Sequence, residues 1–288
     1  MPTVRTNDIE TYYERRGDGP AIVFVHGSIV DSGMWDDQVA ALRDEFTTVV
    51  YDVRGHGRTG GSSRDRYDMA LYASDLHELV TALDLDRPVI CGHSMGGLVA
   101  QAYAIEYPDE VCGLLLANTF TPTILTRSEW FLRRVAMNAF PPLVRVVGIE
   151  RLERFNVWVA ERFSKGVSGD YERVEMLRED GTTITTAEFG KVIRSMARAH
   201  EHPFDLSAIG VPTLILYGEN EKGLVRDHAR LLSDTLVDCA VDVVPGGGHA
   251  SNLDNPAFFS AAVRQFANRA VGRNGETATG EDAETTTK

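Results

Sequence analysis

The sequence predicts an α/β fold, a doubly wound and mostly parallel sheet into which one helical segment is inserted. Short apolar runs of strand length recur along the chain, and segments with helical periodicity separate them. This alternation stops over residues 121–207, where apolar and aromatic residues recur at helical spacings. We therefore expect a core of residues 1–120 and 208–271, a helical cap of residues 121–207, and a disordered tail of residues 272–288 that lacks large apolar side chains.

The first part of the chain supplies a hairpin and then strands with their helices. Asn7-Asp8 tolerates the left-handed backbone of a tight turn, so residues 4–15 are expected to form a hairpin at the sheet edge. Residues 21–25 form a continuous apolar run, typical of a parallel strand covered on both faces, and further strands are expected at residues 46–52, 89–91 and 111–117. Helical patterns cover residues 35–42, 67–83 and about 95–107.

The alternation resumes after the insertion. Strands are expected at residues 212–217 and 240–244, with a helix reaching Leu232 between them. Asn252-Leu253-Asp254-Asn255-Pro256 has the pattern of a capping residue followed by Pro in the first turn, which predicts a closing helix through Phe266. An insertion after a central strand is expected to fold over the carboxyl edge of the sheet, where open α/β sheets bind ligands.

Composition excludes several classes of function. The chain has 288 residues and a formal net charge of -13, which disfavours binding to nucleic acid or to anionic membranes. No apolar run approaches the roughly 18 residues of a membrane span, and the N-terminus lacks the apolar core of a signal peptide. Cys91, Cys112 and Cys239 are odd in number and lie in apolar segments, which indicates reduced thiols. We expect a cytoplasmic protein.

A Gly-x-Ser-x-Gly turn joins the strand expected at residues 89–91 to its helix. In Gly92-His93-Ser94-Met95-Gly96 the two glycines allow the strand and the helix to approach closely, and the turn exposes the Ser94 hydroxyl. The N–H of Met95 begins the helix and is aimed at whatever the hydroxyl attacks. Ser94 is therefore a candidate nucleophile; the alternative is a glycine-rich loop with a surface serine.

Two further loops lie at the same edge of the predicted sheet. His26-Gly27-Ser28 follows the first parallel strand, and the N–H of Ser28 is a candidate second oxyanion donor; the alternative is a simple strand-to-helix loop. Gly55, Gly57 and Gly60 match a dinucleotide-binding spacing, but a loop follows them instead of a helix, so we do not expect nucleotide binding. Asp52 and Arg54 are interpreted as an ion pair that fixes this loop, with Asp52 as a less favoured catalytic candidate.

A serine hydroxyl attacks at neutral pH only if a histidine takes its proton, and that histidine needs a carboxylate to fix its tautomer. Ser94, Glu221 and His249 each follow a predicted strand, and they occur in the order nucleophile, acid, histidine. With these motifs, residues 3–271 resemble the α/β-hydrolase fold superfamily, in its branch of cofactor-free esterases, enol-lactonases, C–C bond hydrolases and haloperoxidase-like perhydrolases.

The resemblance implies catalytic roles for Ser94, Glu221 and His249, and oxyanion-hole roles for the N–H groups of Ser28 and Met95. The family's acid is usually Asp, whereas this chain offers Glu221, with Glu219 as its nearest competitor. Some members carry the acid after the preceding strand, but this chain has Asn118 there, and asparagine supplies no negative charge.

The implied activity is a serine hydrolase that cleaves a carboxylic ester, lactone or similar acyl substrate through an acyl-enzyme. No cofactor or metal is expected, and the expected partner is a small-molecule substrate. A small-molecule receptor of the same fold is one alternative. Perhydrolase or C–C bond hydrolase activity with the same three residues is another, and residue spacing does not distinguish between these reactions.

Overall fold

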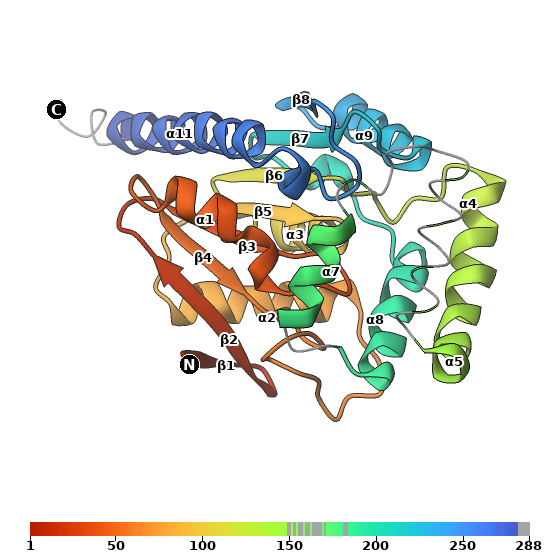
Figure 1. Cartoon of the computed structure of the whole chain (residues 1–288). Helices are drawn as coiled ribbons and strands as arrows, with labels where there is room; N and C mark the ends of the chain where they lie inside the picture. The colour runs from red at the N-terminus through yellow and green to blue at the C-terminus, as the bar shows by residue number, and fades with distance from the viewer. Residues whose placement is uncertain are drawn as a thin grey trace, which may run out of the picture.

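The computed structural model describes residues 1–148, 151, 154, 158, 162, 169, 171–180 and 184–281. The core is one eight-stranded sheet in the order β1-β2-β4-β3-β5-β6-β7-β8 (Figure 1). The strands are β1 (Thr3–Thr6), β2 (Ile9–Arg16), β3 (Ala21–Val25), β4 (Thr47–Tyr51), β5 (Val89–His93), β6 (Gly113–Ala117), β7 (Thr213–Gly218) and β8 (Cys239–Val244). β1 and β2 pair antiparallel, β2 pairs antiparallel with β4, and the remaining pairs are parallel. The predicted fold class and edge hairpin are confirmed.

Helices cover both faces of the sheet because successive strand residues point to opposite sides. Val23 and Val25 pack into the cluster that includes α2 (Met69–Ala82) and α3 (Met95–Glu106). Ile22 and Phe24 pack on the other side with residues of α1 (Asp36–Leu42) and α11 (Pro256–Glu281). The remaining core helices are α9 (Gly223–Thr235) and α10 (Ser251–Asp254), and short 3-10 turns cover Ser32–Trp35, Pro108–Glu110, Ala199–Glu201 and Leu206–Ala208.

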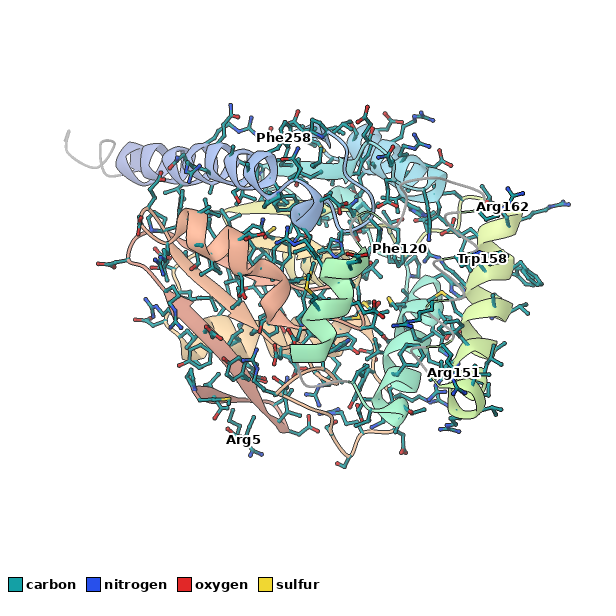
Figure 2. The ribbon with its side chains drawn as sticks, viewed as in Figure 1. Arg5, Phe120, Arg151, Trp158, Arg162 and Phe258 are labelled. Carbon is teal, nitrogen blue, oxygen red and sulfur yellow. The ribbon has the colours of Figure 1, made fainter. Side chains whose placement is uncertain are left out.

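The chain between β6 and β7 forms the helical insertion. It contains α4 (Arg127–Phe131), the π-helical stretch η3 (Leu132–Ala136), α5 (Met137–Val147), α7 (Tyr171–Asp180) and α8 (Thr186–Arg198). α8 lies between the core and the α4–α5 segment (Figure 1), and Phe120 lies where the chain leaves the core (Figure 2).

Polar contacts attach this insertion to the core. The Tyr67 hydroxyl donates to Glu188 of α8. Arg173 of α7 donates to the carbonyl of Leu253 and pairs with Asp37 at 2.6 Å. In the first insertion helix, the buried carboxylate of Glu129 contacts Arg133 and also His228 of α9. The insertion is therefore held over the loops at the carboxyl ends of the strands.

Two details differ from the sequence-based expectations. α11 continues past Phe266 to Glu281, because each added residue gains a further backbone hydrogen bond once a helix has started; residues 282–288 of the predicted tail lie outside the described residues. The ion pair expected between Asp52 and Arg54 was wrong, since Asp52 pairs with Arg58 and Arg54 pairs with Asp75. No helix in the described part of the chain is long and apolar enough to cross a membrane.

Candidate active site

Ser94 lies on a strained turn between β5 and α3. Its backbone has φ 52° and ψ -113°, a conformation that residues other than glycine rarely adopt. A Cβ at Gly92 would collide with the backbone of Gly96, and one at Gly96 would collide with the carbonyl of Val25. Both positions therefore require glycine, as the sequence predicted, and the turn keeps the Ser94 side chain at the edge of the sheet.

His249 and Glu221 complete a hydrogen-bonded chain with Ser94. His249 Nε2 lies 3.1 Å from Ser94 Oγ, and His249 Nδ1 lies 2.8 Å from Glu221 Oε2. Because a carboxylate only accepts hydrogen bonds, His249 carries its proton on Nδ1 and Nε2 is left to accept the hydroxyl proton of Ser94. The Glu221 carboxylate is fully buried, whereas the His249 side chain is 40% exposed. The arrangement can therefore transfer a proton between a serine and a histidine that remains accessible.

Glu221 is held in its ionised form. Burial acts to raise the pKa of this carboxyl, but electrostatic attraction to His249 and hydrogen bonds from His249, Asn118 and the Lys222 N–H outweigh burial and hold the pKa at about 2. Glu219, the competing acid, instead accepts a hydrogen bond from the N–H of Gly246. The structure thus brings Glu221 to the histidine.

Asn118 is a member of this site that the sequence reasoning considered only as a missing acid. Its Nδ2 donates to Glu221 Oε2 at 2.7 Å and to the carbonyl of Gly248 at 3.0 Å. Its Oδ1 accepts from the Ser251 hydroxyl, which fixes the orientation of the amide. The sequence did contain a signal for this role, because Asn118 is a polar residue directly after the strand that neighbours the Ser94 strand.

The loop after β3 lies against the Ser94 turn. A Cβ at Gly27 would lie 3.4 Å from Ser94 Cβ. His26 Nε2 accepts from the Val53 N–H, so its Nδ1 donates to the Gly27 carbonyl at 2.7 Å. Burial lowers the pKa of His26, which keeps the ring neutral.

The hydrogen bond from His26 fixes the peptide between Gly27 and Ser28. In a trans peptide the N–H points opposite to the carbonyl, so the Ser28 N–H points away from His26. Among the described residues, neither this N–H nor that of Met95 has a hydrogen-bond partner. Ile29 follows at φ 64°, which is rare for a β-branched residue, and such strain is concentrated at functional sites.

Asp52, the less favoured catalytic candidate, and two neighbouring histidines make structural contacts instead. Asp52 accepts hydrogen bonds from Ser32 and from the backbone and side chain of Arg58, and it makes no contact with His249. His93 Nε2 donates to the carbonyl of His249, and His56 Nδ1 lies near backbone carbonyls of its own loop. In the glycine-rich loop, Gly60 bridges back to His56, and no helix starts there.

Comparison with known proteins places the chain in a family. Residues 20–256 match the family model described as alpha/beta hydrolase fold. The 3-oxoadipate enol-lactonase 2 of Acinetobacter baylyi is 26% identical over 93% of this chain and 96% of its own length. A putative carbamate hydrolase of Agrobacterium fabrum is 26% identical over 89% of this chain and 96% of its own length. The structure of a thermophilic esterase from Thermogutta terrifontis, with malate bound, superposes with a TM-score of 0.76 and 25% identity. The match covers 94% of this chain and 99% of the esterase.

These matches confirm the resemblance seen in the sequence motifs, and they support hydrolase activity. The family match covers both the strand that carries Ser94 and the loop that carries His249. The chain belongs to the alpha/beta hydrolase fold family.

Proposed function

We propose that this hydrolase cleaves a carboxylic ester, a lactone or a comparable acyl compound through an acyl-enzyme on Ser94. The Oγ of Ser94 attacks the carbonyl carbon, and its proton passes to His249 Nε2. Glu221 stabilises the imidazolium that forms, and the N–H groups of Ser28 and Met95 hold the negative oxygen. His249 then protonates the leaving oxygen, and a water molecule activated by His249 releases the acid from Ser94.

The observation that carries this proposal is the unbroken chain of hydrogen bonds from Ser94 through His249 to Glu221. The strained Ser94 backbone and the fixed peptide before Ser28 support it, since both hold reacting groups in place before substrate binds. The reaction uses only side chains and backbone groups, so it requires no cofactor. The relatives named as an enol-lactonase and an esterase make lactones and esters the first substrates to test.

We assign the insertion helices the role of a cap that sets substrate choice, because the insertion is anchored beside the loops that carry the site. Three reduced cysteines, two of them buried, suit a reducing compartment, and we propose the cytoplasm.

A panel of p-nitrophenyl esters of increasing acyl length, together with simple lactones, tests the reaction. The wild-type chain should turn over many equivalents, and Ser94→Ala should lose activity by about three or more orders of magnitude. A fluorophosphonate should label the wild type and not Ser94→Ala. Release of one equivalent of p-nitrophenol followed by arrest for every ester would instead favour a receptor, and undiminished turnover by Ser94→Ala would exclude Ser94 as the nucleophile.

A further inference from the structure

A cavity of about 560 Å³ lies away from the Ser94 site, between the start of α2, the end of α3 and α8 with the segment that follows it. Its volume falls in the range of small-molecule pockets. Ser94, Glu221 and His249 are absent from its lining, so it is separate from the candidate active site. One wall is apolar and includes Ile105 and Phe204.

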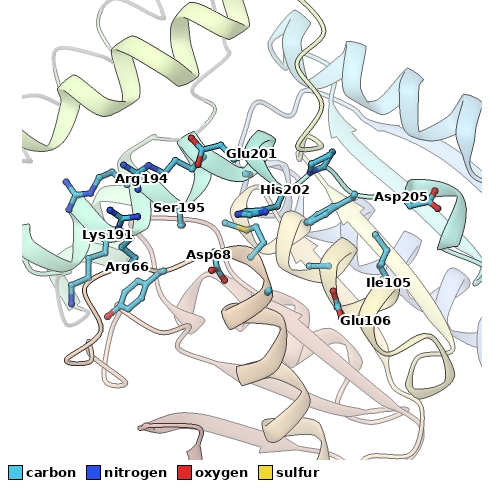
Figure 3. A pocket seen from close by; sticks show the side chains of 18 of the residues that line it. Arg66, Asp68, Ile105, Glu106, Lys191, Arg194, Ser195, Glu201, His202 and Asp205 are labelled. Carbon is cyan, nitrogen blue, oxygen red and sulfur yellow. The ribbon is translucent and has the colours of Figure 1, made fainter.

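Cations gather at one end of this cavity. Figure 3 shows Arg66, Lys191 and Arg194 on one side, with Ile105 on the opposite side. Lys191 is engaged, because its ammonium contacts Glu188 and the carbonyl of Ser62. In the part of the chain that the structure describes, no carboxylate pairs with Arg66 or Arg194.

Arg194 is the central cation of this group. It is half-buried, and Arg198 follows it by one helical turn and also lines the cavity. Burial lowers the pKa of Arg194, and the charges of Arg145 and Arg198 lower it further. Like charges one turn apart destabilise a helix, so a bound negative group would relieve a repulsion that is present in the free protein.

The cavity also has acidic residues, and they restrict the charge of a ligand. Asp65, Asp68, Glu106, Glu201 and Asp205 line it. Asp68 and Asp205 accept hydrogen bonds at the starts of helical turns, and Glu201 lies 3.9 Å from Arg134. Glu106 and Asp205 lie at the end opposite Arg66 and Arg194 (Figure 3). A negative group therefore fits the arginine end, and the five carboxyl groups of the lining favour a singly charged anion over a dianion.

We propose that this cavity is a second ligand site, which binds an apolar carboxylic acid as its carboxylate. The carboxylate contacts the guanidinium groups of Arg66 and Arg194, and the hydrocarbon part packs against Ile105 and Phe204. Guanidinium groups suit this role because they donate several hydrogen bonds to the two oxygens of a carboxylate.

Isothermal titration calorimetry of the full chain tests the site, with octanoate, octanol and acetate as probes. The protein is first labelled at Ser94 with a fluorophosphonate, so that octanoate does not bind at the candidate active site. Octanoate should bind one equivalent. Octanol lacks the charge and acetate lacks the chain, so each should bind at least about tenfold more weakly.

Two variants and a control assign the binding to this cavity. Arg194→Gln removes a charge, and Ala70→Trp fills space from an exposed lining position; each should weaken octanoate binding about tenfold or more. Arg226→Gln, an exposed arginine on α9 outside the cavity, should bind octanoate like the wild type. Equal binding of octanol and octanoate, unchanged binding by both cavity variants, or no saturable binding of octanoate would overturn the proposal. None of these results bears on hydrolysis at Ser94.

Discussion

Replacing Glu221 by Gln removes the negative charge beside His249 and keeps the length of the side chain. The pKa of this carboxyl lies at about 2 instead of its ordinary value of 4.5. That difference corresponds to about 3 kcal/mol of preference for the ionised form. The carboxylate is buried, so solvent screens this interaction little.

The amide also leaves one donor of this site without an acceptor. Glu221 Oε2 accepts from both Asn118 Nδ2 and His249 Nδ1, and Oε1 accepts from the N–H of Lys222. A glutamine with its oxygen at the Oε2 position keeps the first two contacts, but its NH₂ group then faces the Lys222 N–H. In the opposite orientation His249 Nδ1 faces the NH₂ group and must accept, which moves its proton to Nε2 and leaves no acceptor for Ser94. Loss of the charge, together with molecules in the second orientation, predicts a fall in kcat on the order of 10³ to 10⁴.

The assay is the steady-state hydrolysis of the best p-nitrophenyl ester, with far-ultraviolet circular dichroism to verify folding. Glu219→Gln is the matched control, because Glu219 contacts Gly246 and not His249, and it should keep near wild-type kcat. Glu221→Asp should retain part of the activity, since it keeps the charge with a shorter reach. A folded Glu221→Gln with wild-type kcat, or an inactive Glu219→Gln, would refute the assignment of the acid.

Other consequences concern the neighbours of Glu221 and the Ser94 turn. Asn118→Ala removes a donor to Glu221, so the pKa of Glu221 should rise and kcat should fall about tenfold; pH–rate profiles measure both effects. Because the pKa of Glu221 is depressed, its stabilisation of the fold is present above about pH 4.5 and is lost as pH falls toward 2. Urea unfolding should show that Glu221→Gln lacks this dependence. Gly96→Ala forces a methyl group against the Val25 carbonyl and should cost about 1–3 kcal/mol or more in urea unfolding. Gly223→Ala meets open space and should cost little.

Local patterns predicted most of the core, because strand length, apolar runs and glycine spacing are short-range properties. The Gly92 and Gly96 positions are an example, since each is fixed by a steric contact within the strand-turn-helix unit or with the neighbouring strand. The His249 loop was found for a related reason: parallel strands end at the same edge of the sheet, so the residues after them meet.

These local patterns do not show which side chains pair when they are far apart in the sequence. Arg54 lies two residues from Asp52, yet it pairs with Asp75 on α2, 21 positions away in the chain, and with Asp8 of the edge hairpin. The cavity lined by Arg194 is built from three segments that are far apart in sequence, so no single window shows it. The prediction ended the last helix at Phe266, where the large apolar residues stop. In the structure α11 continues beyond that point without them.

The acid at residue 221 and the amide at residue 118 form one arrangement. Two adjacent strands, β6 and β7, end beside His249, and each supplies a side chain to the same place. If both supplied carboxylates, their repulsion in a buried site would force one of them to bind a proton. Asn118 avoids this, because its Nδ2 donates to Glu221 Oε2 and to the Gly248 carbonyl.

Both oxygens of Glu221 are then satisfied. Oε2 accepts from Asn118 and His249, and Oε1 accepts from the N–H of Lys222 at 2.7 Å. A buried carboxylate with this many donors stays ionised, so the negative charge of this pair resides on Glu221 and lies against the His249 ring. The asparagine that removes one possible acid thus keeps the other charged.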